Sequence, residues 1–145
     1  MRTIYTRHLS AQALSALLER VASDAPCFVG VSDVEFRPFF VNRFGRRLVG
    51  LEDDFDVRAL FIADFFVSED RAMIRDVALP TLRRDGVWEG KYRFHHFSGG
   101  ASVEVEWNAF ILRDRTRAVT GAACITTGLT ERIEAEARVR ESARV

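Results

Sequence analysis

The sequence predicts an α+β fold in which helices cover an antiparallel sheet. Its strongest signal is residues 87–97, VWEGKYRFHHF, where bulky aromatic residues alternate with polar residues. The aromatic residues are Trp88, Tyr92 and Phe94. An alternation of apolar and polar residues with a period of two is typical of a strand with one solvent-exposed face. Two more strand-like runs, 102–112 and 119–127, follow across short loops. The three runs therefore predict an antiparallel meander.

The first element is an amphipathic helix. Leu14, Leu17, Leu18 and Val21 fall at i, i+3, i+4 and i+7, the spacing of one helix face. Ser10 precedes them as a plausible N-cap. Asp24-Ala25-Pro26 ends the helix, because proline disfavours a helical residue before it.

A hairpin and a short helical turn come next. The runs CFVGVSD and FRPFFVN predict two short strands joined near Val34 and Glu35. Asn42 then caps a turn over 43–49, which Gly50 closes.

Two helical segments precede the meander. Residues 56–66 mix apolar and charged side chains and predict a short helix. Ser68 is then expected to cap a longer helix, with acidic residues in its first turn and Arg83-Arg84 in its last. Met73, Val77 and Leu82 are expected to face inward, and Pro80 to kink or interrupt the last turns.

The sequence ends in a charged helix. Residues 129–145 are rich in Glu, Arg and Ala, and only a thin apolar seam runs along them: Leu129, Ile133 and Ala137. Such a helix is not stable alone and usually continues into a coiled coil or packs on a partner. We therefore expect the chain to be a piece of a longer protein, although a short independent protein is the alternative.

Composition limits the function classes. The 21 basic residues balance 21 acidic ones, which argues against general nucleic-acid binding. Hydrophobic residues make up 48% of the 145, including twelve Phe, enough for a real core. Two cysteines, Cys27 and Cys124, are too few for a disulfide framework. We find no signal segment and no membrane-spanning run, so we expect a cytoplasmic protein with no membrane contact in this segment.

Several segments in this order resemble a PAS domain between about Cys27 and Glu134. They are FVGVSD, FVNRFGRRLVG with Asn42 and Gly50, FVSEDR with Pro replaced, and DGVWEG. WEGKYRFHHF is especially similar to PAS modules of bacterial sensor histidine kinases. The resemblance implies a five-stranded antiparallel sheet with short helices on one face, in a domain spanning 27–128. It also implies an N-terminal capping or dimerisation helix in 1–26 and an outgoing signalling helix in 129–145. Gly128 stands where the family commonly has Asp.

The residues do not favour catalysis. Ser32, Ser98 and Ser102 lie outside any nucleophile-elbow pattern, and a hydrolase triad is improbable. His95 and His96 are adjacent on a strand and point to opposite faces, so they cannot easily share a metal ion. We therefore expect no enzyme activity and no metal site.

No specific cofactor is indicated. Haem-binding PAS domains generally use a histidine from the long helix, and 69–85 contains none, although His96 keeps haem open. Trp107-Asn108-Ala109-Phe110 resembles a flavin-binding branch of the family in which the asparagine faces the flavin. The reactive cysteine of that branch is missing from 56–66. Haem and flavin are therefore both unfavoured, and Asn108 can equally bridge strands.

If the resemblance gives the directions of the strand faces, one set of side chains surrounds a cavity. These candidate ligand-binding residues are Ser32, Asn42, Leu60, Met73, Val77, Trp88, Tyr92, Phe94, Asn108, Phe110, Leu112, Cys124 and Thr126. Apolar walls with few polar groups are typical of small-molecule sites. An ordinary filled core has the same composition and is the favoured alternative.

The opposite face of the sheet is also predicted to be apolar, so something must cover it. Its candidate docking residues are Val105, Trp107, Ile111 and Ile125. The first helix, with Leu14, Leu17, Leu18 and Val21, is the expected cover, from the same chain or from a second copy. We therefore expect the protein to form a homodimer through these surfaces.

These features predict a cytosolic PAS sensory and dimerisation module that binds a small ligand. We expect it to be the input domain of a sensor histidine kinase. One alternative is a ligand-free PAS spacer. Another is a small α+β cone of the nuclear-transport-factor type, as a ligand-binding protein or as a dehydratase or isomerase that uses Asp and His in a deep pocket. The early hairpin argues against the cone.

Overall fold

A five-stranded antiparallel sheet forms the centre of the computed structural model, which describes residues 10–142 except the side chains of 130–135. The strand order is β2-β1-β5-β4-β3. The strands are β1 (Phe28–Ser32), β2 (Pro38–Val41), β3 (Val87–Phe94), β4 (Val103–Arg113) and β5 (Val119–Gly128). The α+β class, the early hairpin and the meander predicted from the sequence are confirmed.

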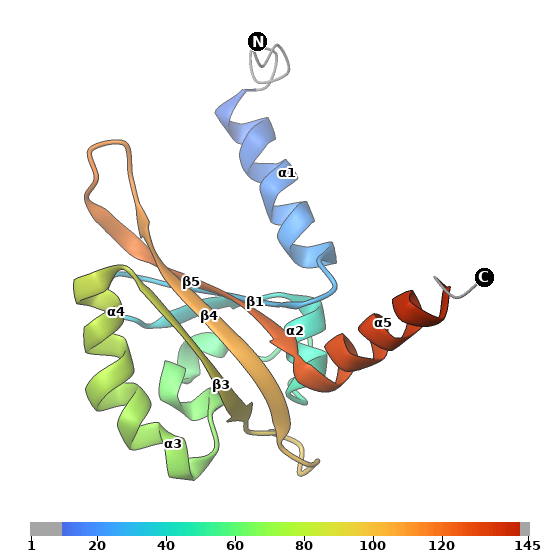
Figure 1. Cartoon of the computed structure of the whole chain (residues 1–145). Coiled ribbons are helices and arrows are strands. Elements are labelled where there is room, and N and C mark those ends of the chain that lie inside the picture. The colour runs from blue at the N-terminus through green and yellow to red at the C-terminus, as the bar shows by residue number, and fades with distance from the viewer. Residues whose placement is uncertain (1–9, 143–145) are drawn as a thin grey trace.

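Helices cover one side of this sheet, and two more helices project away from it (Figure 1). The covering segments are α2 (Arg43–Leu48), η2 (Val57–Ala59), η3 (Ile62–Phe65), α3 (Ser68–Met73), η4 (Ile74–Ala78) and α4 (Leu79–Asp85). The projecting helices are α1 (Ala11–Asp24) and α5 (Leu129–Ser142). We call the sheet face toward α3 and α4 the inner face and the opposite face the outer face.

Most helix boundaries follow the local signals in the sequence. Ser10 caps α1 by accepting a hydrogen bond from the Ala13 amide, and Asn42 caps α2 by accepting one from the Gly45 amide. Two boundaries differ from expectation. The single helix expected over 56–66 is two separate 3-10 turns, and Val67, not Ser68, precedes α3. The Ser68 hydroxyl instead contacts the Glu69 carboxylate.

The helix expected after Ser68 is interrupted before Pro80 by a change of helical type. A π-helical segment, η4, separates α3 from α4, and Pro80 sits in the first turn of α4, where a proline is tolerated. This insertion moves the buried stripe to Ile74, Ala78 and Leu82. The expectation that Val77 faces inward is therefore wrong: its side chain is 49% exposed.

Aromatic rings fill the space between the inner face and the helices. Phe66, two residues before α3, contacts Trp107, Phe94 and Tyr92 at ring-centroid distances of 4.9, 5.1 and 5.5 Å. Trp107 is only 3% exposed. Edge-to-face pairs of this kind add stability beyond the apolar area that they bury.

The strand pairing reverses the expected faces of β4. Trp107 pairs with Gly90 on β3 and Thr126 on β5, while Asn108 pairs with Glu89 and Ile125. The residues expected on the outer, docking side therefore lie on the inner face: Val105, Trp107 and Ile111. The residues expected around the cavity lie on the outer face: Asn108, Phe110 and Leu112. Both sets are apolar, so periodicity alone could not separate them.

One sequence signal did distinguish the two faces. Glu104 and Glu106 share the parity of Asn108, Phe110 and Leu112 on β4. The expected assignment would have turned both carboxylates toward the core, where an unpaired charge is costly. The observed pairing puts them opposite Arg93 and Lys91 of β3.

The side chain of Asn42 joins four segments. Its Oδ1 accepts hydrogen bonds from the amides of Val29 and Gly45, both at 3.0 Å. Its Nδ2 lies 2.9, 3.4 and 2.8 Å from the carbonyl oxygens of Ala22, Ala25 and Cys27. Asn42 is 1% exposed. The amide therefore ties the end of α1 to β1, β2 and α2.

Asn42→Asp tests this role. Aspartate caps helices as well as asparagine does, so a capping role alone predicts little change. We expect the free energy of unfolding to fall by about 2–5 kcal/mol, because a carboxylate oxygen would then face three carbonyl oxygens. Urea unfolding measures the loss, with the outer-face variant Asn108→Asp as the matched control. A loss below about 0.5 kcal/mol for Asn42→Asp would contradict the role.

The faces of β4 can be tested with a pair of truncations. Trp107→Ala should destabilise the fold by about 3–5 kcal/mol, because it empties the centre of the aromatic core. Phe110→Ala removes an outer-face ring and should cost about 1 kcal/mol in the monomer. Urea unfolding at low protein concentration separates them. Equal losses would refute the assignment.

Candidate functional site

A small cavity lies between the inner face of the sheet and the covering helices. Its volume is about 50 Å³. The sheet contributes Gly30, Ala109, Ala122 and Cys124, and the covering segments contribute Ile62, Phe65, Phe66 and Leu82. Among the residues that the structure describes, no charged side chain lines it. A volume this far below the roughly 300–1,000 Å³ of drug-sized sites shows a core that is mostly filled.

Only part of the predicted pocket set reaches this cavity. Ser32, Phe94 and Cys124 line it. Trp88, Tyr92 and Thr126 are on the inner face but outside the lining, and the Trp88 indole donates a hydrogen bond to the Tyr92 hydroxyl at 2.9 Å.

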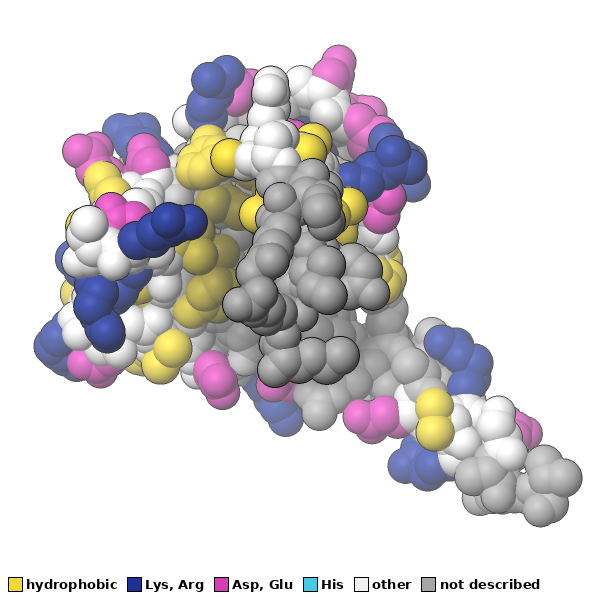
Figure 2. All heavy atoms as spheres, turned by 90° about the horizontal axis from the view of Figure 1, so that it is seen from above, with side chains coloured by type: hydrophobic (Ala, Val, Ile, Leu, Met, Phe, Trp, Pro, Cys, Tyr) yellow, Lys and Arg dark blue, Asp and Glu magenta, His cyan; other side chains and the backbone are white. Residues whose placement is uncertain are grey.

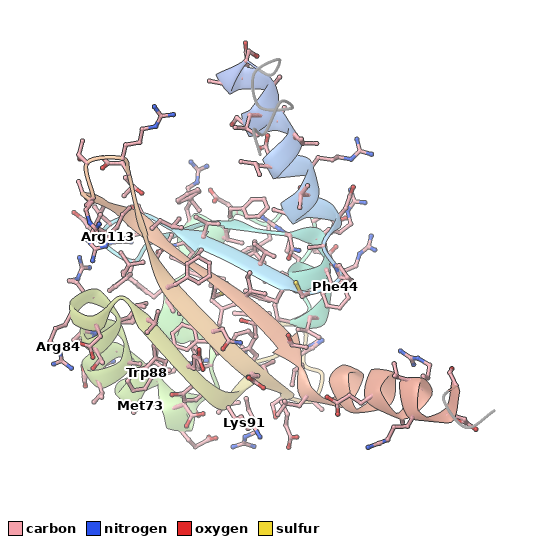
Figure 3. All side chains as sticks on the ribbon, turned by 45° about the horizontal axis from the view of Figure 1, so that its top comes forward. Phe44, Met73, Arg84, Trp88, Lys91 and Arg113 are labelled. Carbon is pink, nitrogen blue, oxygen red and sulfur yellow. The ribbon has the colours of Figure 1, made fainter. Side chains whose placement is uncertain are left out.

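The other predicted pocket residues lie elsewhere. Leu60 and Met73 pack against the core without lining the cavity, and Met73 is on the helix-covered side of the sheet (Figure 3). Asn42 ties α1 to the sheet, and Val77 is exposed. Asn108, Phe110 and Leu112 are on the outer face. Asn108 therefore cannot contact a group held in this cavity, including the flavin contact that its neighbours suggested.

Sequence reasoning missed the floor of the cavity. Gly30 pairs with Cys124, Cys124 pairs with Ala109, and Ala122 pairs with Ile111 and Ser32. Small side chains thus meet at the centre of three adjacent strands. The sequence signal was the run GAAC at 121–124, whose members are small on both faces, but the strand pairing was needed to bring Gly30 and Ala109 beside it.

The polar groups near the floor are few and neutral. Burial raises the pKa of the Cys124 thiol, while smaller effects of the Thr126 and Trp107 side chains and of the Gly30 backbone lower it. The thiol is therefore protonated at neutral pH. The Ser32 hydroxyl donates to the Asp33 carbonyl at 3.2 Å, and the Thr126 hydroxyl is buried without a hydrogen bond among the described residues.

The turn between the lining residues Ser32 and Pro38 is held in place by side-chain contacts. Arg83, next to the lining residue Leu82, donates to the Val34 carbonyl at 2.9 Å and stacks over the Phe36 ring at 4.4 Å. Phe36 has a left-handed backbone, φ 62°, which is uncommon for a large side chain. The Asp33 carboxylate holds this turn by accepting from the amides of Glu35 and Arg37.

The histidines lie away from the cavity. His95 packs edge-to-face on Phe97 at 4.9 Å, and His96 Nδ1 accepts a hydrogen bond from the Gly100 amide at 3.0 Å. The Ser98 hydroxyl donates to the Gly50 carbonyl at 3.0 Å and also lies 3.5 Å from His96 Nδ1. Within residues 10–142, no three His, Cys, Asp or Glu side chains are grouped so that they could hold a metal ion.

Two apolar surfaces lie away from the inner face: the first is exposed, and the second is half-buried except at Ile125, which is 47% exposed. We call the first the α1 stripe: Leu14, Leu17, Leu18 and Val21, all predicted for docking and 38–59% exposed. The second, the outer patch, is formed by Val29, Val31, Phe40, Phe110, Leu112, Ala123 and Ile125, which the strand pairing places on one face. Hydrophobic side chains form a band between charged ones when this side is viewed along α1 (Figure 2). Of the predicted docking residues on the sheet, only Ile125 belongs to the patch.

The thin apolar seam of the C-terminal helix is only partly described. Leu129 is half-buried at the start of α5, and Ala137 is exposed. The side chain of Ile133 lies outside the described residues, as do residues 1–9 of the N-terminal segment. No helix in the described part of the chain is long and apolar enough to cross a membrane.

The sequence matches no protein-family model and no curated protein sequence. Solved structures, in contrast, match closely in shape. A PAS domain from Colwellia psychrerythraea has a TM-score of 0.70 at 16% identity, covering 81% of this chain and 98% of that one. An RNA-binding Light-Oxygen-Voltage receptor has a TM-score of 0.70 at 20% identity, covering 94% of this chain and 39% of that one.

A third match is a PAS domain from a two-component sensor histidine kinase, with a TM-score of 0.67 at 14% identity. It covers 82% of this chain and 99% of that one. The cone of the nuclear-transport-factor type is not the fold, because the hairpin β1–β2 precedes the covering helices and pairs into the same sheet as the meander. The order of the strands, the helices on one face and these three matches together establish that the chain has the PAS fold.

Proposed function

We propose that this chain is a non-enzymatic sensory and dimerisation module of a cytosolic bacterial signalling protein, and that it serves as the input domain of a sensor histidine kinase. The observation that carries the proposal is that one PAS-fold chain has two apolar surfaces, the α1 stripe and the outer patch, that its described residues leave exposed or half-buried. The kinase assignment rests on similarity in fold to a PAS domain from such a kinase.

The α1 stripe is held away from its own sheet. No residue of α1 is buried. The Asn42 side chain binds the Ala22 carbonyl inside α1 and the Ala25 and Cys27 carbonyls just after it. Folding α1 back over the outer patch would break the hydrogen bond to the Ala22 carbonyl, and losing such a buried hydrogen bond typically costs about 1–3 kcal/mol. A second copy is therefore the better cover.

A pair of copies satisfies both surfaces at once. Each chain supplies one α1 stripe and one outer patch, so a two-fold axis can bury all four surfaces in a self-complementary interface. Polar side chains at the edge of the patch, including Glu89 and Lys91 of β3, suit the rim of such an interface.

Signal transfer would use the connection between the sheet and the projecting helices. A small molecule in the inner cavity that fits one packing of the sheet better than another would bias the positions of α1 and α5. The shift is limited to the difference in affinity between the two arrangements. A ligand-free dimerisation spacer is the alternative, favoured by the small size of the cavity.

Dimerisation is tested by placing a charge on either surface. Leu18→Asp on the α1 stripe and Ile125→Asp on the outer patch should each weaken the dimer about 100-fold or more, because the interface would bury an unpaired carboxylate. Both positions are exposed in the single chain, at 58% and 47%, so the monomer should stay folded. Analytical ultracentrifugation measures the dissociation constants.

Val77→Asp is the matched control for these variants. Val77 is 49% exposed but lies on the helix-covered side of the molecule. It should dimerise as the wild type does. If the two test variants behave like this control, the docking surfaces do not form the dimer.

The absence of a coloured cofactor is tested on the purified protein. We expect no visible absorbance band, because the cavity is too small for haem or flavin and Asn108 points away from it. Native mass spectrometry of the same sample distinguishes an empty dimer from one carrying a colourless ligand. A haem or flavin spectrum with the matching added mass would contradict the expectation.

A further inference from the structure

The inner cavity owes its existence to four small residues at the centre of the sheet. Gly30, Cys124 and Ala109 are consecutive cross-strand neighbours on β1, β5 and β4, and Ala122 is the next inner-face residue along β5. Larger inner-face side chains lie on either side, among them Phe28, Trp107 and Ile111. The sheet therefore has a depression one side chain deep.

The aromatic residues that cover this depression cannot move down to fill it. Phe66 is fixed by its contacts with Trp107, Phe94 and Tyr92, and Phe65 by its contacts with Phe28 and Phe97. A methyl group at Gly30 would already lie 3.1 Å from the Phe28 ring and 3.2 Å from the Cys124 sulfur. The space beside Gly30 toward Phe28 and Cys124 is thus crowded, and Ala109 and Ala122 are the two alanines of β4 and of the inner face of β5 that border the free volume.

The chemistry of the lining restricts what could occupy this volume. A water molecule usually needs two to four polar partners in such a site. Here the Ser32 hydroxyl already donates to the Asp33 carbonyl, and the Cys124 thiol is a weak hydrogen-bonding group. An ion would meet no countercharge among the described lining residues.

We propose that the cavity binds one small, neutral, apolar molecule of only a few heavy atoms, in contact with the lining residues Ala109, Ala122 and Cys124. The proposal rests on the ligand-binding part of the proposed function and narrows the ligand to this class. A volume of about 50 Å³ excludes drug-sized ligands unless the core opens. The dry, apolar lining favours an occupant without charge or hydrogen-bonding groups.

Xenon is a suitable probe, because it enters dry apolar cavities in proteins. In methyl NMR spectra of the full chain, xenon should shift the Ala109, Ala122 and Leu82 methyl signals in a saturable way. Acetate, a small anion, should leave them unchanged at the same concentration. No saturable xenon shift, or a saturable shift with acetate, would overturn the proposal.

Ala122→Val should lower the apparent xenon affinity at least about 10-fold, because the added methyl groups fill the cavity. Ala118→Val adds the same atoms to an exposed residue just before β5 that does not line the cavity, and should bind xenon as the wild type does. Ala109→Val is a second filling variant if Ala122→Val fails to fold. Unchanged affinity in the filling variants would place the xenon elsewhere and refute the proposed seat.

This result is independent of the dimerisation test. If the chain dimerises through α1 and the outer patch but binds no xenon, the proposed dimerisation module is supported and the small apolar ligand is refuted. If the chain binds xenon but stays monomeric, the small apolar ligand is supported and the proposed dimer is refuted.

Discussion

The buried amide of Asn42 is the constraint on which the arrangement of the chain depends. It accepts two backbone hydrogen bonds and faces three carbonyl oxygens, at the point where α1, β1, β2 and α2 meet. No other side chain of similar size offers both an acceptor and two donors in a plane. Because the amide also binds the Ala22 carbonyl inside α1, it fixes the end of α1 relative to the sheet.

The sheet is apolar on both faces for different reasons. On the inner face, large aromatic rings pack around Phe66, and small residues at the centre leave a cavity. On the outer face, aliphatic and aromatic side chains from four strands form a patch with no cover from the described part of the chain. A filled core explains the first face, and a second copy of the chain is our proposed cover for the second.

Much of this fold could be predicted from the sequence, because local signals determined most boundaries. The Ser10 and Asn42 caps, the proline after α1 and the period-two pattern of β3 each act within a few residues. The errors came from longer-range effects. The faces of β4 depended on its pairing with β3 and β5, and the exposure of Val77 depended on a π-helical insertion that no local pattern indicates.

The candidate site was harder to predict for the same reason. Ser32, Phe94 and Cys124 were found because their strands have a clear alternation, whereas Gly30, Ala109 and Ala122 form a floor only after three strands have paired. Small residues carry no periodic signal of their own. Asn42 was expected beside a ligand, because a buried amide suggests recognition, yet its polar atoms are all used by the backbone.

The positions of α1 and α5 have a consequence for how the domain can be combined with others. Phe28, four residues after α1, pairs with Thr126, three residues before α5, so the chain arrives at and departs from neighbouring strands at one end of the sheet (Figure 1). Neighbouring strands are about 4.8 Å apart. A domain attached at two such close points adds little length to the path between its neighbours. It can therefore be inserted into a helical connector, or repeated along one, with little change in the span of that connector.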